Sequence, residues 1–228
     1  MLDWFHSLTA WQFVGVLSAA NVAMYAASWL LVAGVQFAFA DRNLNQEPVR
    51  VTRSDFALSL LIVAINIAVG LPGWWLWQAG WITLTHSGPL RCLLDLAGIV
   101  FFFDVAMYAL HRVMHWGWLY RWFHGRHHDH VDVSGISFYV MNPLEAIGFG
   151  LLLVLFLTLY SMNFYALLWF LFFNWLYGTM GHCGVPVEHP ALAWLVGDTE
   201  FHHKHHQQHR GNYGFYTGIW DRLFGTAI

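Results

Sequence analysis

Histidines are the residues of this sequence whose number and spacing best suit chemistry. Thirteen of the fifteen lie between His111 and His209. They recur as one HxxxH pair and two HxxHH triplets, and residues three or four apart share one face of a helix. A further histidine stands alone between the two triplets. The nine residues that this spacing selects are His111, His115, His124, His127, His128, His182, His202, His205 and His206.

The three histidine clusters, each on one helical face, and the isolated His182 together predict a metal site with two ions. Imidazole binds Zn, Cu, Fe and Ni, and one ion takes at most about six ligands. Two ions would therefore share the nine rings and keep open or water-filled positions. A single HxxxH pair is often only a pair of surface histidines, but the three clusters together favour ligation. Four histidines fit no face, and we expect them to be solvated or to support the ligands: His130, His189, His203 and His209.

Asp104 and Tyr108 precede His111 by seven and three residues, so both share its helical face. A carboxylate inside a membrane-spanning helix is costly and usually functional. We expect Asp104 to accept the free ring N–H of a ligand histidine and to fix its tautomer. The alternative is a polar contact between packed helices.

The elements that must position these residues are membrane helices. Apolar residues make up 58% of the chain and charged residues only 10%, against roughly 25% charged in a typical soluble domain. A membrane span needs about 20 apolar residues. The uncharged runs predict helices over residues 11–40 and 56–85, the second kinked or ended near Pro72, and a third over 90–115. Residues 146–181 are too long for one span, and we expect a hairpin that turns near residues 161–163.

The predicted fold is an all-α integral membrane protein with four to five hydrophobic helices, the last two a hairpin, and a cytosolic histidine-rich cap that binds two metal ions. Residues 1–89 would form N-terminal membrane helices, and residues 90–228 the catalytic region of the same structural unit. Basic residues mark cytoplasmic loops, and a nine-to-one split of Arg and Lys predicts the N-terminus outside and the cap in the cytoplasm. Only Arg91 would lie outside. The nine inside are Arg42, Arg50, Arg53, Arg112, Arg121, Arg126, Lys204, Arg210 and Arg222.

Composition and spacing also exclude several classes of protein. The formal net charge of −3 gives no basic excess for nucleic-acid binding. Cys92 and Cys183 lie far apart, which excludes a disulfide framework and a cysteine-based metal site. A histidine-rich metal-binding protein or metal transporter without redox catalysis remains the alternative, although transporters place ionisable residues at mid-membrane.

The motifs resemble those of the fatty acid hydroxylase and sterol desaturase superfamily of membrane di-iron enzymes. The resemblance covers about residues 90 to 228, and the first two helices match only in character. One element departs from the family pattern RxHPxE, because Val140 and Asn142 stand where the family has arginine and histidine. The matching positions are Asp104, Tyr108, the nine histidines, Pro143, Glu145, residues 212–214 and residues 220–226.

The resemblance implies two iron ions bound by the nine histidines, which zinc could replace on overexpression. It also implies that Asn212 and Asp221 lie beside the ligands, with Asp104 and Tyr108. The implied reaction is the hydroxylation or desaturation of a lipid (sterol, fatty acyl or related) with O₂ and external electrons. The lipid would enter from the bilayer, and we expect a separate carrier of the cytochrome b5, ferredoxin or reductase type to supply the electrons. Zinc and iron cannot be distinguished from imidazole ligands alone.

Overall fold

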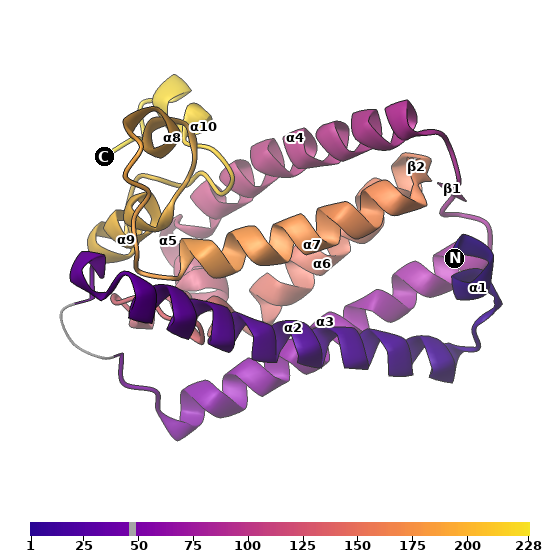
Figure 1. Cartoon of the computed structure of the whole chain (residues 1–228), viewed down its shortest axis with the longest axis horizontal. Coiled ribbons are helices and arrows are strands. Elements are labelled where there is room, and N and C mark those ends of the chain that lie inside the picture. The colour runs from indigo at the N-terminus through magenta and orange to yellow at the C-terminus, as the bar shows by residue number, and fades with distance from the viewer. Residues whose placement is uncertain (46–48) are drawn as a thin grey trace.

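Five long helices run alongside one another in the described part of the chain, residues 1–45 and 49–228 of this computed structural model (Figure 1). A cap of short helices closes one end of the bundle, where the C-terminus also lies. The long helices are α2 (Ala10–Ala38), α3 (Arg53–Gln78), α4 (Pro89–Met114), α6 (Pro143–Leu159) and α7 (Phe164–Gly181).

Short elements occupy the two ends of the bundle. At the N-terminal end, α1 (Leu2–Ser7) accompanies the strands β1 (Leu84–Thr85) and β2 (Met162–Asn163), which pair in parallel with Leu84 opposite Met162. The chain also forms 3-10 turns at Ala40–Arg42, His127–Asp129 and Ser137–Tyr139, and a π turn at Tyr120–His124. The cap helices are α5 (Gly117–Leu119), α8 (Pro190–Leu195), α9 (Thr199–Gln208) and α10 (Ile219–Leu223).

The membrane helices confirm the predicted fold class. Among the described residues, α2, α3 and α4 are each long and apolar enough to cross a membrane. The shorter α6 and α7 form the expected hairpin, and the chain turns between Leu159 and Met162. The protein is therefore an all-α membrane protein with a histidine-rich cap at one end.

The second helix is shorter at its C-terminal end than its apolar run predicts. α3 ends at Gln78, because Gly80 adopts φ +78° and the amide of Trp81 turns back to the carbonyl of Leu76 at 2.8 Å. Pro72 lies inside α3 and does not end it. Apolar surroundings make an unpaired backbone group costly, which favours continuing a helix through a proline.

Short polar side chains cap the N-terminal ends of α9 and of four of the five long helices, while α4 begins after Gly88 without such a cap. The Thr9 and Thr52 side chains each accept an N–H from the first turn of α2 and α3. Asn142, Asn163 and Asp198 do the same for α6, α7 and α9. Each such cap satisfies backbone donors that have no partner within the helix. Asn142 therefore has a defined local role at the position where the family has histidine.

Packing and buried hydroxyl groups join the helices. α3 packs on α2 and α6, and α4 packs on α7. Ser28 of α2 is fully buried, and its hydroxyl lies 3.0 Å from that of Thr179 and accepts the indole N–H of Trp175 at 2.8 Å, both on α7. Such polar contacts hold helices together where hydrophobic burial gives no preference between lipid and protein.

Asp95 holds the hairpin turn at the end of the bundle opposite the cap. Its carboxylate is fully buried and accepts from the Arg91 guanidinium at 2.6 Å, the Tyr160 hydroxyl at 2.8 Å and the Asn163 amide at 2.7 Å. One carboxylate thus joins α4 to the turn between α6 and α7.

Replacing this carboxylate should destabilise the bundle. Asp95→Ala leaves the buried backbone amide of Asn163 without an acceptor and removes the contacts to Arg91 and Tyr160. We expect a loss of about 2 to 3 kcal/mol, since hydrogen bonds to charged groups are among the stronger ones. Thermal unfolding of the purified protein in detergent measures the loss. Asp3→Ala, which removes an exposed carboxylate in α1, is the control. Equal melting temperatures for the two variants would contradict this role of Asp95.

Candidate metal centre

All nine predicted histidines gather at the cap end, where four segments of the chain meet. The end of α4 supplies the HxxxH pair, and α9 supplies the second triplet. His182 is the residue that ends α7. The spacing of the first triplet predicted an α-helix, and this prediction was wrong. The chain forms a π turn and then a 3-10 turn there.

The nine rings form two groups. Within each group the ligand nitrogens, one per ring, all lie within 4.8 Å of one another. Each HxxHH triplet contributes to both groups, so its three rings do not face a single point as the helical spacing suggested. The five-histidine group is His111, His115, His124, His128 and His205, and the four-histidine group is His127, His182, His202 and His206.

The rings are held through their Nδ1 atoms. In the described part of the chain, seven of the nine place Nδ1 within hydrogen-bond distance of an oxygen that can only accept. Nδ1 of these seven therefore carries the proton, and a neutral ring then leaves Nε2 as a bare acceptor. Six oxygens are backbone carbonyls, and the seventh belongs to a carboxylate. The pairs are His111–Tyr213, His115–His209, His124–Glu145, His127–Val140, His182–Gly178, His205–Gly211 and His206–His130.

Bare Nε2 atoms face each other in both groups. Nε2 of His111 lies 2.9 Å from Nε2 of His124, and Nε2 of His206 lies 3.2 Å from Nε2 of His127. Two lone pairs at this separation repel unless a cation lies between them. The donor set is all imidazole nitrogen, which suits a first-row transition metal. The residues present therefore fit a metal ion in each group.

Burial keeps these rings neutral at pH 7. It is the main cause that lowers the pKa of His127 to about 4 and the pKa values of His124, His205 and His206 well below 6.5. Neighbouring imidazoles lower the pKa values further. Neutral imidazole is the form that binds a metal.

Asn212 and Asp221 hold the loop that supports two of the rings. Asp221 is fully buried and accepts from the amides of Tyr213 at 2.8 Å and Gly214 at 2.6 Å. Asn212 donates to the carbonyl of Phe201 at 3.0 Å and accepts from the amide of Ile228 at 2.9 Å. The carbonyls that accept from Nδ1 of His111 and His205 belong to this loop. Asn212 and Asp221 therefore support these two rings through the backbone of the loop.

Asp104 has other partners than the expected ligand histidine. Its carboxylate accepts from the amide and hydroxyl of Thr217, at 2.9 and 2.7 Å, and from the indole N–H of Trp220 at 2.9 Å. Seven residues of helix correspond to about 10 Å along the axis, which places this carboxylate well below the rings. The helix-packing alternative was therefore the better one, since Asp104 fixes the C-terminal segment on α4.

Tyr108 also contacts the C-terminal segment. Its hydroxyl lies 3.1 Å from the hydroxyl of Thr226 and accepts from Arg112 at 3.0 Å, and its ring stacks on Phe224. The side chain shares the face of His111, as predicted, but supports the cap and does not contact a ligand ring.

Three of the four remaining histidines support the centre or lie beside it. The carbonyl of His209 receives Nδ1 of His115. The carbonyl of His130 receives Nδ1 of His206, and its ring lies 3.3 Å from Asp55. His203 is buried, but its ring contacts Gln207 at 2.9 Å and belongs to neither group. Supporting carbonyls carry no signal in a sequence, so spacing could not identify them.

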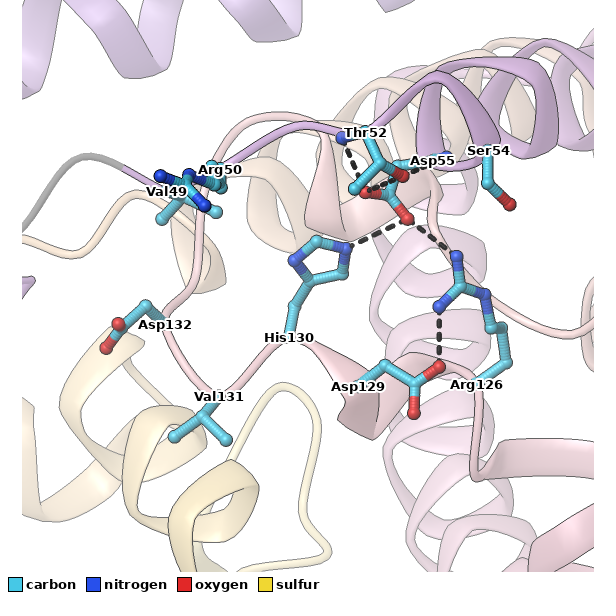
Figure 2. A pocket seen from close by; sticks show the side chains of 10 residues that line it. All are labelled: Val49, Arg50, Thr52, Ser54, Asp55, Arg126, Asp129, His130, Val131 and Asp132. Atoms are coloured by element: carbon cyan, nitrogen blue, oxygen red, sulfur yellow. Dashed lines mark hydrogen bonds and ion pairs between the residues drawn. The ribbon is translucent and has the colours of Figure 1, made fainter.

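An open pocket of about 720 Å³ lies against the segment that carries the first triplet (Figure 2). Asp55, at the start of α3, accepts from Arg126 at 2.6 Å and lies beside His130, and Arg126 also pairs with Asp129. None of the nine histidines lines the pocket. These contacts fix the segment 126–130 on α3 and so support His127, His128 and the carbonyl of His130.

The chain is similar to proteins of one described family. A family model described as fatty acid hydroxylase matches residues 96–226. A cholesterol 25-hydroxylase-like protein of Danio rerio is 28% identical over 157 residues, which cover 67% of this chain and 62% of the relative. A Delta(7)-sterol 5(6)-desaturase of Candida glabrata is 29% identical over 144 residues, which cover 62% of this chain and 38% of the relative.

A plant protein matches more of this chain. The very-long-chain aldehyde decarbonylase GL1-5 of Oryza sativa subsp. indica is 26% identical over 204 residues, which cover 85% of this chain and 31% of the relative. The match thus spans less than two thirds of the length of each of the three relatives. No solved structure is significantly similar to the chain.

The burial of neutral rings makes the stability of the metal-free protein depend on pH. An unfolded histidine has a pKa near 6.5, while that of His127 in the folded protein is about 4. Between these values the unfolded chain binds more protons, so stability is full above pH 6.5 and falls as the pH drops toward 4. We therefore expect a lower melting temperature at pH 5 than at pH 7.5.

Thermal unfolding of the metal-free protein in detergent at both pH values tests this expectation. His86→Gln changes an exposed histidine at the opposite end of the bundle and should leave the pH dependence intact. A melting temperature that does not fall at pH 5 would contradict the neutral, buried state of the rings.

Proposed function

The chain belongs to the fatty acid hydroxylase family, and on this premise we propose that it is a membrane-bound non-haem di-iron oxidoreductase. It would use O₂ and external electrons to hydroxylate or desaturate a C–H bond of a lipid. The observation that carries the metal part is the facing pair of bare Nε2 atoms in each histidine group. The similarity to a hydroxylase-like protein and to a desaturase supports the oxidation of a lipid.

The residues of the chain would hold and shield the metals. Iron ions bound in the two groups would supply the power to activate O₂ and attack an unactivated C–H bond, which no side chain supplies. The five-histidine and four-histidine groups present different numbers of nitrogens, and the smaller group leaves more room for a further ligand. Burial of the rings excludes bulk water, which protects a reactive centre from side reactions.

A narrow pocket lies beside the four-histidine group, where the reacting part of a lipid would have to come. His182 and His202 line it, together with Tyr177, Phe215 and several glycines. Its volume of about 10 Å³ is close to the minimum that holds one water molecule, so side chains must move to admit a substrate. The substrate would reach it from the bilayer along the hairpin. Phe149, Phe156 and Phe173 of the hairpin pack against the core, which supports a structural role for those residues.

The cap would face the cytoplasm, where a separate carrier of the cytochrome b5, ferredoxin or reductase type would deliver electrons. The basic residues at the cap end support this orientation, since Lys and Arg mark the cytoplasmic side. Arg121 and Arg210 are exposed there and would attract an acidic carrier or anionic lipid headgroups. A metal transporter is less well supported, because the histidines lie at the end of the bundle and transporters bind ions at mid-membrane.

The lipids of a host that produces the protein test the reaction. Wild-type protein should yield an oxidised lipid that is missing from the host with His206→Ala, because His206 is a proposed ligand. Growth under ¹⁸O₂ distinguishes a hydroxylated product, which carries the label, from a desaturated one. Identical lipid profiles for the two hosts would refute the proposed activity.

The metal content tests the ligand set. Protein from iron-supplemented medium should hold about two iron ions per chain, and His202→Ala should lower the content. His203→Ala, one residue further, should retain it because its ring belongs to neither group. Zinc after ordinary overexpression is compatible with the proposal, since Zn(II) binds such sites more tightly than Fe(II). One ion or none would contradict a dinuclear centre.

Labelling of single cysteines tests the orientation. With Cys92 and Cys183 replaced by serine, a cysteine at the exposed Gln208 should react with an impermeant thiol reagent only from the cytoplasmic side. A cysteine at the exposed Thr83, at the opposite end, should react only from outside. The reverse pattern would overturn the orientation and the site of carrier docking.

A further inference from the structure

Glu145 is the one side chain among the seven acceptors that hold the histidine rings of the described chain. Its Oε1 accepts from Nδ1 of His124 at 2.8 Å, and both side chains are almost fully buried, at 4% and 3% exposure. The other six rings rest on neutral backbone carbonyls. His124 belongs to the five-histidine group. Among the described residues, only this group therefore has a ring whose Nδ1 contacts a carboxylate.

The start of α6 fixes the position of this carboxylate. The side-chain oxygen of Asn142 caps the helix by accepting from the backbone amide of Leu144 at 2.9 Å. The backbone carbonyl of Asn142 accepts from the backbone amide of Glu145 at 3.0 Å. Pro143 occupies the first helical position. Glu145 therefore belongs to the apolar hairpin, whereas its histidine partner belongs to the cap.

The other oxygen of the Glu145 carboxyl group has no compensating partner of its own in the described part of the chain. Oε2 of Glu145 is buried and has no hydrogen-bond partner among the described residues. Arg126, a basic residue of the segment that carries His124, pairs with Asp55 and Asp129. Burying a carboxylate is costly unless a charge compensates it. A cation bound at Nε2 of His124 supplies that charge across one imidazole ring.

We propose that Glu145 is a positioning residue that makes the five-histidine group bind a metal dication more tightly than neutral support alone would allow. It fixes the Nδ1–H tautomer of His124 and raises the basicity of Nε2, as carboxylate partners of metal-binding histidines do. The two centres are therefore inequivalent. This inference rests on the proposed function, because it requires a metal ion at the histidine groups.

Titration of the full-length, metal-free protein in detergent with Co(II) tests the proposal through binding affinity and the visible absorption of the bound ion. Glu145→Gln keeps the volume and an acceptor oxygen but removes the charge, and we expect about a 10-fold weaker affinity for one ion. Glu145→Ala removes the acceptor as well, and we expect about a 100-fold weaker affinity, within the range known for such partners. The affinity for the other ion should stay unchanged.

Two backgrounds assign the affected ion. In His182→Ala only the five-histidine group is complete, and Glu145→Gln should weaken Co(II) binding there and shift its absorption. In His205→Ala only the four-histidine group is complete, and the same change should have no effect. Glu200→Gln is the control, because it removes an exposed carboxylate paired with Lys204 on α9, the helix that carries three of the ligands.

The possible results separate the inference from the function on which it rests. Weakening of one ion, in the His182→Ala background only, supports the role of Glu145. Equal weakening of both ions together with a lower melting temperature marks a structural residue and overturns it, as does unchanged affinity in Glu145→Ala. Wild-type protein that binds no Co(II) contradicts the proposed metal centre itself and the inference with it.

Discussion

Burying nine imidazoles side by side is costly unless their ring N–H groups have acceptors, and the described part of the chain places an oxygen at Nδ1 of seven of them. An unpaired buried donor costs about as much as a lost hydrogen bond, so the chain must bring free oxygens to the rings. Carbonyls inside a helix are already occupied, whereas those near a helix end and in irregular turns are free. The carbonyls of Gly178, near the end of α7, and of Val140, Gly211 and Tyr213, in turns, serve this purpose. This explains why so much of the cap is irregular.

The rest of the bundle keeps those turns in place. Asp221 and Asn212 hold the loop behind two rings, and Asp104 attaches the same C-terminal segment to α4. Asp55 holds the segment of the first triplet on α3. The carboxylates of Asp221, Asp104 and Asp55 are each buried and accept from several donors. Such hydrogen bonds are directional, so they fix the position of the backbone. The hydrophobic contacts between α4, α6 and α7 set the distance between helices, and the polar contacts set the register.

The membrane helices and the histidine clusters could be predicted because each depends on one continuous run of sequence. An uncharged run longer than 20 residues has few alternatives to a membrane helix, and helical spacing identified the nine histidines that the structure gathers. The spacing could not show how they divide. His127 lies between His124 and His128 in the chain but belongs to the other group. The backbone there is not α-helical, because a π turn ends at His124 and a 3-10 turn begins at His127. The partner of Asp104 was missed for a similar reason, since Thr217 is 113 residues away and only the folded chain joins them.

Support by backbone carbonyls has a consequence for how such a centre can change over evolution. A carbonyl oxygen is the same in every residue, so a substitution at Val140 or Tyr213 need not remove the acceptor that a ring requires. Only the path of the backbone must persist, and this restricts residues of unusual conformation. Gly211 adopts φ +67°, and a Cβ atom there would lie 2.6 Å from the carbonyl of Thr226. The sequence around the rings can therefore drift widely while the geometry of the nitrogens is inherited. Among the seven described acceptors, Glu145 is the one whose oxygen a substitution would remove.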